Sequence, residues 1–169
     1  MTPAYALLPR TRLTSITQMA PNVRILYLLR DPIERLWSHV RMIAARRDEN
    51  GELTARRAGN ILKRVFQGNE SQIERRGDYA RTLRRLRNSI PDGQLLIGVF
   101  EEMVANGLDR LAEFLGISAF DSSAAPVHVG HPLPMTIEQK TAAERFLRPQ
   151  YKAVERTLGR VPEGWHWKG

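Results

Sequence analysis

An arginine and a serine eight positions apart are the residues of this sequence best suited to bind an anion. In the stretch "LLRDPIERLWSHV", Arg30 follows an apolar run and Ser38 comes two helical turns later. A guanidinium offers paired N–H donors that suit a phosphate, and a hydroxyl adds a neutral donor. In the alternative interpretation, Ser38 faces solvent and Arg30 forms a salt bridge. The candidate carboxylates for that bridge are Asp31, Glu34 and Glu101.

The elements around these two residues are predicted from local patterns. Residues 23–29 are mostly apolar and rich in strand formers, which is typical of a buried parallel strand. Asp31 is a good N-cap and Pro32 suits a first helical position, so a helix is expected from there to about Arg47. Its buried stripe should consist of Ile33, Leu36, Trp37, Val40 and Ala44. Arg30 is therefore predicted at the carboxyl end of a strand, and Ser38 on the helix that follows.

The rest of the chain alternates between helical patterns and one further strand. The run "QLLIGVF" predicts a second buried strand, and Thr136 with Gln139 forms a capping box that starts the last helical region. Pro149 is expected to split that region after Leu147. Further helices are expected over residues 10–20, 61–66, 78–90 and 108–115. This order predicts an α/β fold with a parallel sheet.

Composition narrows the class of protein. The 169 residues suffice for a single domain, and the absence of cysteine excludes disulfides and thiolate sites. No stretch is apolar enough to span a membrane, and the first residues lack the order of a signal peptide, so we expect a cytoplasmic protein. The net charge of +8 comes mainly from arginine and suits an anionic partner; the alternative explanation is solvated helix faces, and only Arg30 has a position that argues for more.

The opening stretch resembles the 3′-phosphate-binding segment of sulfotransferases that use 3′-phosphoadenosine 5′-phosphosulfate (PAPS). In that family an arginine ends a strand and a serine follows eight positions later. The resemblance to heparan-sulfate-type and bacterial members extends over most of the chain, in the family's order. It includes the segments "TPAYALLP", "RGDYARTLRRLRNSIPDGQLLIGVFEEM", "RLAEFLGI" and "FLRPQYKAVERTLGRVPEGW".

The resemblance implies a fold, a cofactor and a set of site residues. The fold would be a P-loop-like three-layer α/β fold, here incomplete, with residues 1–169 forming a single partial domain. Arg30 and Ser38 would bind the 3′-phosphate of PAPS. Gly130 is a weaker candidate, because residues 127–134 match the position of a cofactor-contacting loop but lack the family's Lys-Gly motif. No metal is implied, and the acceptor would be an unidentified hydroxyl or amine, which could belong to a glycan.

One part of the family's machinery has no counterpart in this sequence. Family members cradle the 5′-phosphosulfate with a Gly-rich loop and a lysine, whereas the glycines here are scattered singly. The base that activates the acceptor is expected in the same missing portion, ahead of Met1, so catalytic residues cannot be assigned. We therefore expect a carboxyl-terminal portion of a sulfotransferase, inactive alone, arising from a truncated gene, a late start codon or a degraded copy. Its strands should be partly uncovered, which favours self-association.

Other chemistry-bearing residues receive simpler interpretations. His128 and His131 lie three apart but have no nearby carboxylate cluster that would suggest a metal site. His39 is interpreted as a surface histidine rather than a base, and Tyr79, Trp37 and Trp165 as packing residues.

The alternative function is a basic, non-catalytic module that binds nucleic acid or an acidic glycan. Its candidate surface is the set of paired arginines, for example "RR" at 46–47, 56–57, 75–76 and 84–85. Aromatic residues make up only 7% of the chain, and no interleaving with basic residues suggests base stacking.

Overall fold

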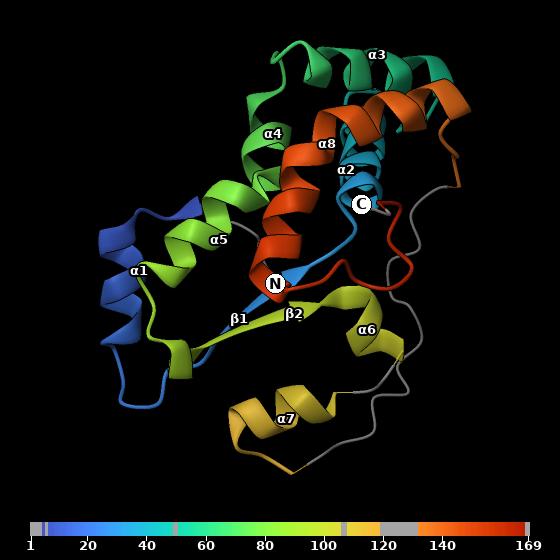
Figure 1. Cartoon of the computed structure of the whole chain (residues 1–169). Coiled ribbons are helices and arrows are strands. Elements are labelled where there is room, and N and C mark those ends of the chain that lie inside the picture. Colours follow the sequence, from blue (N-terminus) through green and yellow to red (C-terminus); the bar gives the residue numbers. More distant parts are fainter. Residues whose placement is uncertain (1–4, 6, 49–50, 106–107, 119–131, 168–169) are drawn as a thin grey trace. The chain divides into compact units, whose positions relative to one another are not determined.

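The structure, a computed structural model, describes the whole chain except residues 1–4, 6, 49–50, 106–107, 119–131 and 168–169. Eight α-helices and two parallel strands are assigned within the described part, which is therefore an α/β fold, as predicted (Figure 1). The elements are α1 (Arg10–Thr17), β1 (Ile25–Leu29), α2 (Pro32–Arg46), α3 (Ala55–Phe66), α4 (Ser71–Gly77), α5 (Tyr79–Arg87), the 3-10 helix η2 (Asp92–Gln94), β2 (Leu95–Val99), α6 (Phe100–Ala105), α7 (Asp109–Leu115) and α8 (Ile137–Leu158).

The chain divides into two compact units, each built from segments that are distant in sequence. The sheet unit contains α1, β1, α5, η2, β2, α6 and α7. The helical unit contains α2, α3, α4 and α8, together with the segment from Trp165 onward. The chain leaves the sheet unit between Arg30 and Asp31.

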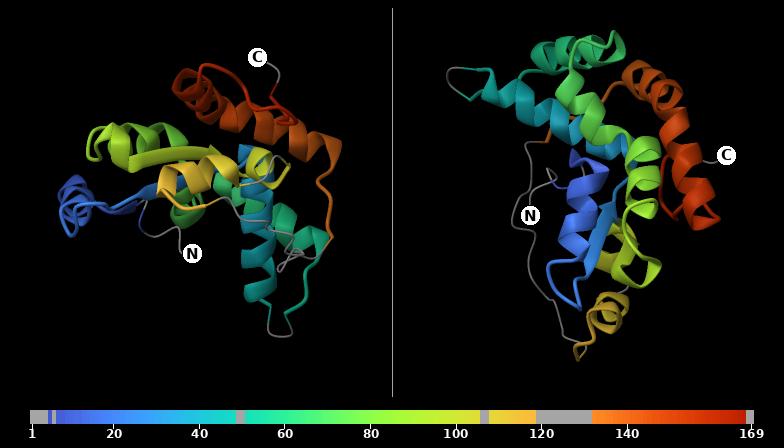
Figure 2. Two further views of the ribbon diagram at one scale, coloured as in Figure 1. Left: turned by 90° about the horizontal axis from the view of Figure 1, so that it is seen from below. Right: turned by 90° about the vertical axis from the view of Figure 1, so that its left-hand side faces the viewer.

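The sheet unit is organised around the parallel pair β1 and β2. Ile25 is in register with Leu95, and Leu29 with Val99, so the two strands end at the same edge (Figure 2). A small core joins α1 and α5 beneath the strands, formed by Leu13, Leu86, Ile90 and the part-buried Leu8, Ile25, Tyr27 and Leu95. Four of the five β1 residues are only half-buried, so the sheet keeps part of its apolar surface exposed.

The helical unit is centred on α2, against which α3, α4 and α8 pack. The helix begins where the sequence predicts: Pro32 is its first residue, and the Asp31 carboxylate accepts hydrogen bonds from the backbone N–H groups of Ile33 (2.8 Å) and Glu34 (3.1 Å). The predicted stripe is buried along its whole length, at Ile33, Leu36, Trp37, Val40 and Ala44. The apolar face predicted from 3.6-residue spacing is therefore the face that packs.

The prediction that Pro149 splits the last helix is wrong. Helix α8 runs without a break from Ile137 to Leu158, with the predicted capping box of Thr136 and Gln139 at its start. A proline inside a helix removes one backbone hydrogen bond and crowds the preceding turn. In α8 the buried side chains of Leu147, Tyr151 and Val154 lie on both sides of Pro149, and their packing outweighs that cost.

A second buried carboxylate joins three elements of the helical unit. Glu70, at the N-cap of α4, is 8% exposed. It accepts two hydrogen bonds from Arg47 after α2 (2.8 and 2.9 Å) and one from Arg64 of α3 (2.8 Å). These bonds lower the pKa of Glu70 to about 2, against the opposing effect of burial. Two of the arginines that contribute to the positive charge therefore serve the fold.

No helix in the described part of the chain is both long and apolar enough to cross a membrane.

Candidate functional site

Arg30 lies at the carboxyl end of β1, as predicted, and its backbone is fixed by a tyrosine. The Arg30 N–H donates to the Tyr79 hydroxyl (3.2 Å), and that hydroxyl donates to the Arg30 carbonyl (2.9 Å). Tyr79 is 2% exposed and makes an edge-on contact with the ring of Tyr27, so its position is set by the core of the sheet unit. One buried side chain thus holds both backbone polar groups of Arg30.

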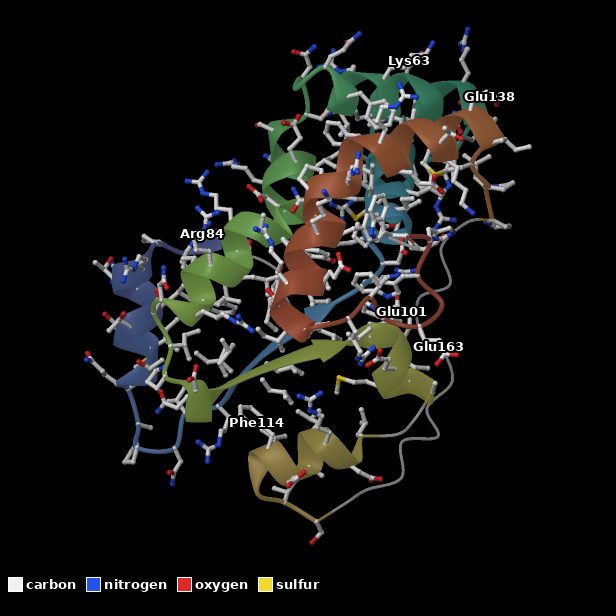
Figure 3. All side chains as sticks on the ribbon, in the orientation of Figure 1. Lys63, Arg84, Glu101, Phe114, Glu138 and Glu163 are labelled. Atoms are coloured by element: carbon white, nitrogen blue, oxygen red, sulfur yellow. The ribbon has the colours of Figure 1, made fainter. Side chains whose placement is uncertain are left out.

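The side chain of Arg30 is held far less tightly than its backbone. Its Nε atom lies 4.0 Å from a carboxylate oxygen of Glu101, and its guanidinium lies over the ring of Phe100 at 5.8 Å. Glu101 is at the start of α6, directly after β2 (Figure 3). The salt bridge considered from the sequence therefore exists, at the limit of ion-pair distance, while 40% of the Arg30 side chain is exposed. Such a pair is weak, so the guanidinium is accessible to an anion.

Ser38 lies on α2, half-buried, in the helical unit. No hydrogen bond of its hydroxyl is found among the described residues, which leaves that donor open to a ligand. Arg30 belongs to the sheet unit, so the two predicted phosphate residues come from different units. Their joint role remains a prediction. Gly130, His128 and His131 fall outside the described residues.

The residue between Arg30 and α2 is the centre of a network that the sequence did not predict. Asp31 is 2% exposed and, besides capping α2, accepts hydrogen bonds from the Tyr151 hydroxyl (3.0 and 3.1 Å) and from the His166 backbone N–H (2.8 Å). The His166 Nδ1 atom lies 3.2 Å from the same carboxylate. We call Asp31, Tyr151 and His166 the Asp31 clasp. It anchors the first turn of the helix that carries Ser38.

The Asp31 clasp has the properties of a structural network that holds its elements in place. Burial and the negative charge of Asp31 raise the pKa of Tyr151, so its hydroxyl stays protonated and donates. The Tyr151 ring stacks on Trp167 (5.7 Å) and meets Trp165 edge-on (6.1 Å). The network could not be predicted from the sequence, because Tyr151 and Asp31 lie 120 residues apart and no local pattern indicates that they pair.

His39 differs from its prediction as a surface histidine. It is half-buried on α2, and burial lowers its pKa to about 4 together with the positive charges of Arg35, Arg76 and Arg46. A histidine with this pKa is neutral at pH 7 and a weak base. The interpretation of Tyr79, Trp37 and Trp165 as packing residues is confirmed by their burial.

Within the described ranges, no group of three His, Asp or Glu side chains is placed to hold a metal ion.

Comparison with known proteins gives a likeness in fold. No protein-family model matches the sequence, and no curated protein matches it. Among solved structures, the chain is similar to a sulfotransferase from Alicyclobacillus acidocaldarius, with a TM-score of 0.68 and 18% sequence identity. The match covers 94% of this chain and 63% of the length of that protein. At this identity the likeness concerns the fold: the described α/β arrangement is sulfotransferase-like.

Proposed function

We propose that this chain is the 3′-phosphate-binding part of a PAPS-dependent sulfotransferase, with Arg30 and Ser38 as the phosphate ligands. The observation that carries the proposal is that Arg30 combines a fixed backbone with an accessible guanidinium. Its backbone is locked by Tyr79 at the carboxyl end of a parallel strand, while its guanidinium stays accessible. Ligands of open α/β sheets bind beyond that edge. The sequence resemblance and the sulfotransferase-like fold support the same assignment.

The donor set of these residues fits a phosphate. A guanidinium supplies charge-assisted hydrogen bonds, and a serine hydroxyl without a described partner adds a neutral donor. When bound, PAPS would supply the sulfuryl group and depart as adenosine 3′,5′-bisphosphate. Arg30 would neutralise the 3′-phosphate, and the Asp31 clasp would hold the helix on which Ser38 presents its hydroxyl. Gly130 stays a weaker candidate for the same ligand.

The residues nearest the sulfur are not identified in this sequence. It contains neither a Gly-rich phosphosulfate loop nor an evident base for an acceptor hydroxyl or amine. We therefore propose that residues 1–169 act as one partial domain that binds nucleotide and does not transfer a sulfuryl group alone.

The proposal is tested by calorimetry with two nucleotides that differ in one phosphate. Adenosine 3′,5′-bisphosphate is expected to bind more tightly than adenosine 5′-phosphate, because only the former carries the 3′-phosphate. Arg30→Ala should weaken the binding of the bisphosphate by about ten- to a hundredfold, the range expected for the loss of charge-assisted hydrogen bonds. The same substitution should leave the monophosphate nearly unchanged, so that the preference disappears.

A matched control is available in the same unit. Arg84 lies on α5 with its side chain exposed (Figure 3), and Arg84→Ala removes an equal charge away from the strand edge. It should change the affinity for the bisphosphate less than twofold. Equal binding of both nucleotides, or equal losses in the two variants, would contradict the proposal.

The alternative function, a basic module for nucleic acid or acidic glycan, is less well supported. Many arginines already make ion pairs or hydrogen bonds within the protein. Arg47 and Arg64 bind Glu70, Arg57 pairs with Asp48, and backbone carbonyls accept hydrogen bonds from Arg10, Arg24 and Arg85. Salt-sensitive binding of random DNA without any binding of adenosine 3′,5′-bisphosphate would favour the alternative.

Two further predictions accompany this proposal. Self-association is expected through the sheet unit, where Met19, Phe100 and Leu115 are exposed beside half-buried strands. Light scattering over a hundredfold range of protein concentration should show a rising mass, and a constant monomer mass would contradict it. A cytoplasmic location remains a prediction from the sequence.

A further inference from the structure

Two residues that follow β2 lie next to the guanidinium of Arg30, and the nucleotide assignment gives them no role. Phe100 and Glu101 are the first two residues of α6, where Figure 3 labels Glu101. The guanidinium lies 5.8 Å from the centre of the Phe100 ring, and its Nε atom lies 4.0 Å from a Glu101 carboxylate oxygen. All three residues belong to the sheet unit, so the arrangement lies within a single unit.

The Phe100 ring helps to keep the guanidinium at the strand edge. An arginine within about 6 Å of an aromatic ring centre is attracted to the face of the ring. Phe100 is 42% exposed, so this attraction is modest, but it acts together with Tyr79, which fixes the Arg30 backbone. A guanidinium forms hydrogen bonds through the N–H groups at its edges rather than through its faces. A phosphate therefore has to bind Arg30 along one of these edges.

Glu101 lies at an edge that suits a phosphate. That edge consists of the Nε–H and one terminal N–H of Arg30, and the Glu101 carboxylate approaches it at Nε. The pair is loose: 4.0 Å is beyond hydrogen-bond distance, and 40% of the Arg30 side chain and 34% of the Glu101 side chain are exposed. Exposed pairs of this kind contribute little to stability, so a phosphate, which carries more charge than a carboxylate, can displace Glu101.

The same carboxylate opposes the phosphate after it has bound. Negative charges a few ångströms apart repel each other, and solvent weakens this repulsion without removing it. Glu101 therefore lowers the affinity of Arg30 for a phosphate in two ways, by pairing with Arg30 in the empty site and by repelling the ligand. Removal of the Glu101 charge should strengthen binding, which is the opposite of what the loss of a structural residue does.

We propose that Glu101 is a positioning residue that speeds release of the nucleotide, because it holds Arg30 when the site is empty and limits the affinity of Arg30 for the 3′-phosphate. The inference rests on the proposed function, since it concerns the departing adenosine 3′,5′-bisphosphate. Product release limits the turnover of many enzymes, and affinity differences between related complexes are mainly differences in dissociation rate. A carboxylate that competes for the same guanidinium lowers the affinity and shortens the residence time of the ligand.

Glu101→Gln tests the proposal, because it keeps the size of the side chain and removes its charge. Calorimetry on the full chain should show that the variant binds adenosine 3′,5′-bisphosphate about three- to tenfold more tightly than wild type, since both the competing pair and the repulsion are lost. Stopped-flow kinetics should assign most of this gain to slower dissociation. The binding of adenosine 5′-phosphate, which lacks the 3′-phosphate, should change less than twofold.

The matched control is Glu113→Gln, which removes an equal charge from an exposed position on α7 of the same unit. It should change the binding of the bisphosphate less than twofold. A double-mutant cycle then tests whether Glu101 acts through Arg30. In an Arg30→Ala background, Glu101→Gln should give a smaller gain than in wild type, and equal gains in both backgrounds would contradict a role through Arg30.

A second readout, nuclear magnetic resonance, does not depend on nucleotide binding. The Arg30 Nε–H resonance, identified by its loss in Arg30→Ala, should shift in nucleotide-free Glu101→Gln, because the carboxylate beside Nε is gone. An unchanged resonance, or unchanged or weaker binding of the bisphosphate, would overturn this inference alone. Equal binding of both nucleotides by wild type would overturn the proposed function and this inference with it. Circular dichroism verifies folding, and Glu101→Ala is the second neutral variant if Glu101→Gln does not fold.

Discussion

The helical unit and the sheet unit treat their charged groups in opposite ways. The helical unit buries two carboxylates, Asp31 at 2% exposure and Glu70 at 8%, and surrounds each with several donors. The sheet unit fixes the backbone of Arg30 and leaves 40% of its side chain exposed. A buried charge with full hydrogen bonding holds elements together, whereas a fixed backbone with an accessible tip is suited to bind a ligand.

The largest effect is expected from Asp31→Ala in the helical unit. The substitution removes the N-cap of α2 and leaves the Tyr151 hydroxyl and the His166 N–H without their acceptor. An N-cap contributes about 1 kcal/mol, and each buried group left unsatisfied costs about 1–3 kcal/mol. The free energy of unfolding should therefore fall by about 3–7 kcal/mol, as measured by urea denaturation. Asp109→Ala, at an exposed aspartate of α7, should change it by less than about 0.5 kcal/mol.

Glu70→Gln should have the next largest effect and a distinctive pH dependence. The pKa of Glu70 is about 2 in the folded protein and near its ordinary value of 4.5 when unfolded. The unfolded chain therefore binds more protons between these values, so this stabilisation is present above pH 4.5 and is lost as the pH falls toward 2. Because both arginine partners are about half exposed, we expect a loss of about 2 kcal/mol at pH 7.

The pH profile separates a charge effect from a packing effect. Chemical denaturation of the two proteins at several pH values should give stabilities that converge toward pH 2. A difference that stays constant from pH 7 to pH 2 would mean that the Glu70 charge is not the cause.

Tyr79→Phe tests the sheet unit with a smaller change. It removes only the hydroxyl that bonds the Arg30 N–H and carbonyl, and it should lower the free energy of unfolding by about 1–2 kcal/mol. If that hydroxyl also positions Arg30, adenosine 3′,5′-bisphosphate should bind several-fold more weakly while adenosine 5′-phosphate is unaffected. Tyr5→Phe, at a 64% exposed tyrosine of the same unit, should change neither property. Weakening of both nucleotides alike would assign Tyr79 a purely structural role.

Pro149→Ala should give the smallest effect, in the stabilising direction. Pro149 is exposed within a continuous α8, so alanine restores a helical N–H without disturbing the core. Because proline also restricts the unfolded chain, the net gain should be about 1 kcal/mol. The melting temperature measures it, and a decrease would show that the proline shapes the helix to fit α2.

Features set by a few neighbouring residues could be predicted from the sequence. The start of α2 follows from Asp31 and Pro32, and the start of α8 from the capping box of Thr136 and Gln139, because each involves hydrogen bonds within about one helical turn. The position of Arg30 after β1 has the same local origin. For the candidate site, these local patterns predicted both Arg30 at the end of β1 and the start of α2 at Asp31 and Pro32.

Features that depend on partners far away in the chain could not be predicted. The continuity of α8 through Pro149 depends on packing, and the Asp31 clasp joins residues 120 and 135 positions apart. Tyr79 was correctly predicted to be buried, but the choice of Arg30 as partner of its hydroxyl depends on tertiary placement. The burial of His39 among arginines depends on how α4 packs against α2.

The Asp31 clasp also sets a limit on when the helical unit can form during synthesis. The Asp31 carboxylate that caps α2 meets His166 only after another 135 residues have been made. Contacts of such long range slow folding and leave apolar surface exposed in the meantime. Part of the α2 stripe therefore stays uncovered until α8 has been made, and binding by a chaperone during that interval would protect it from aggregation.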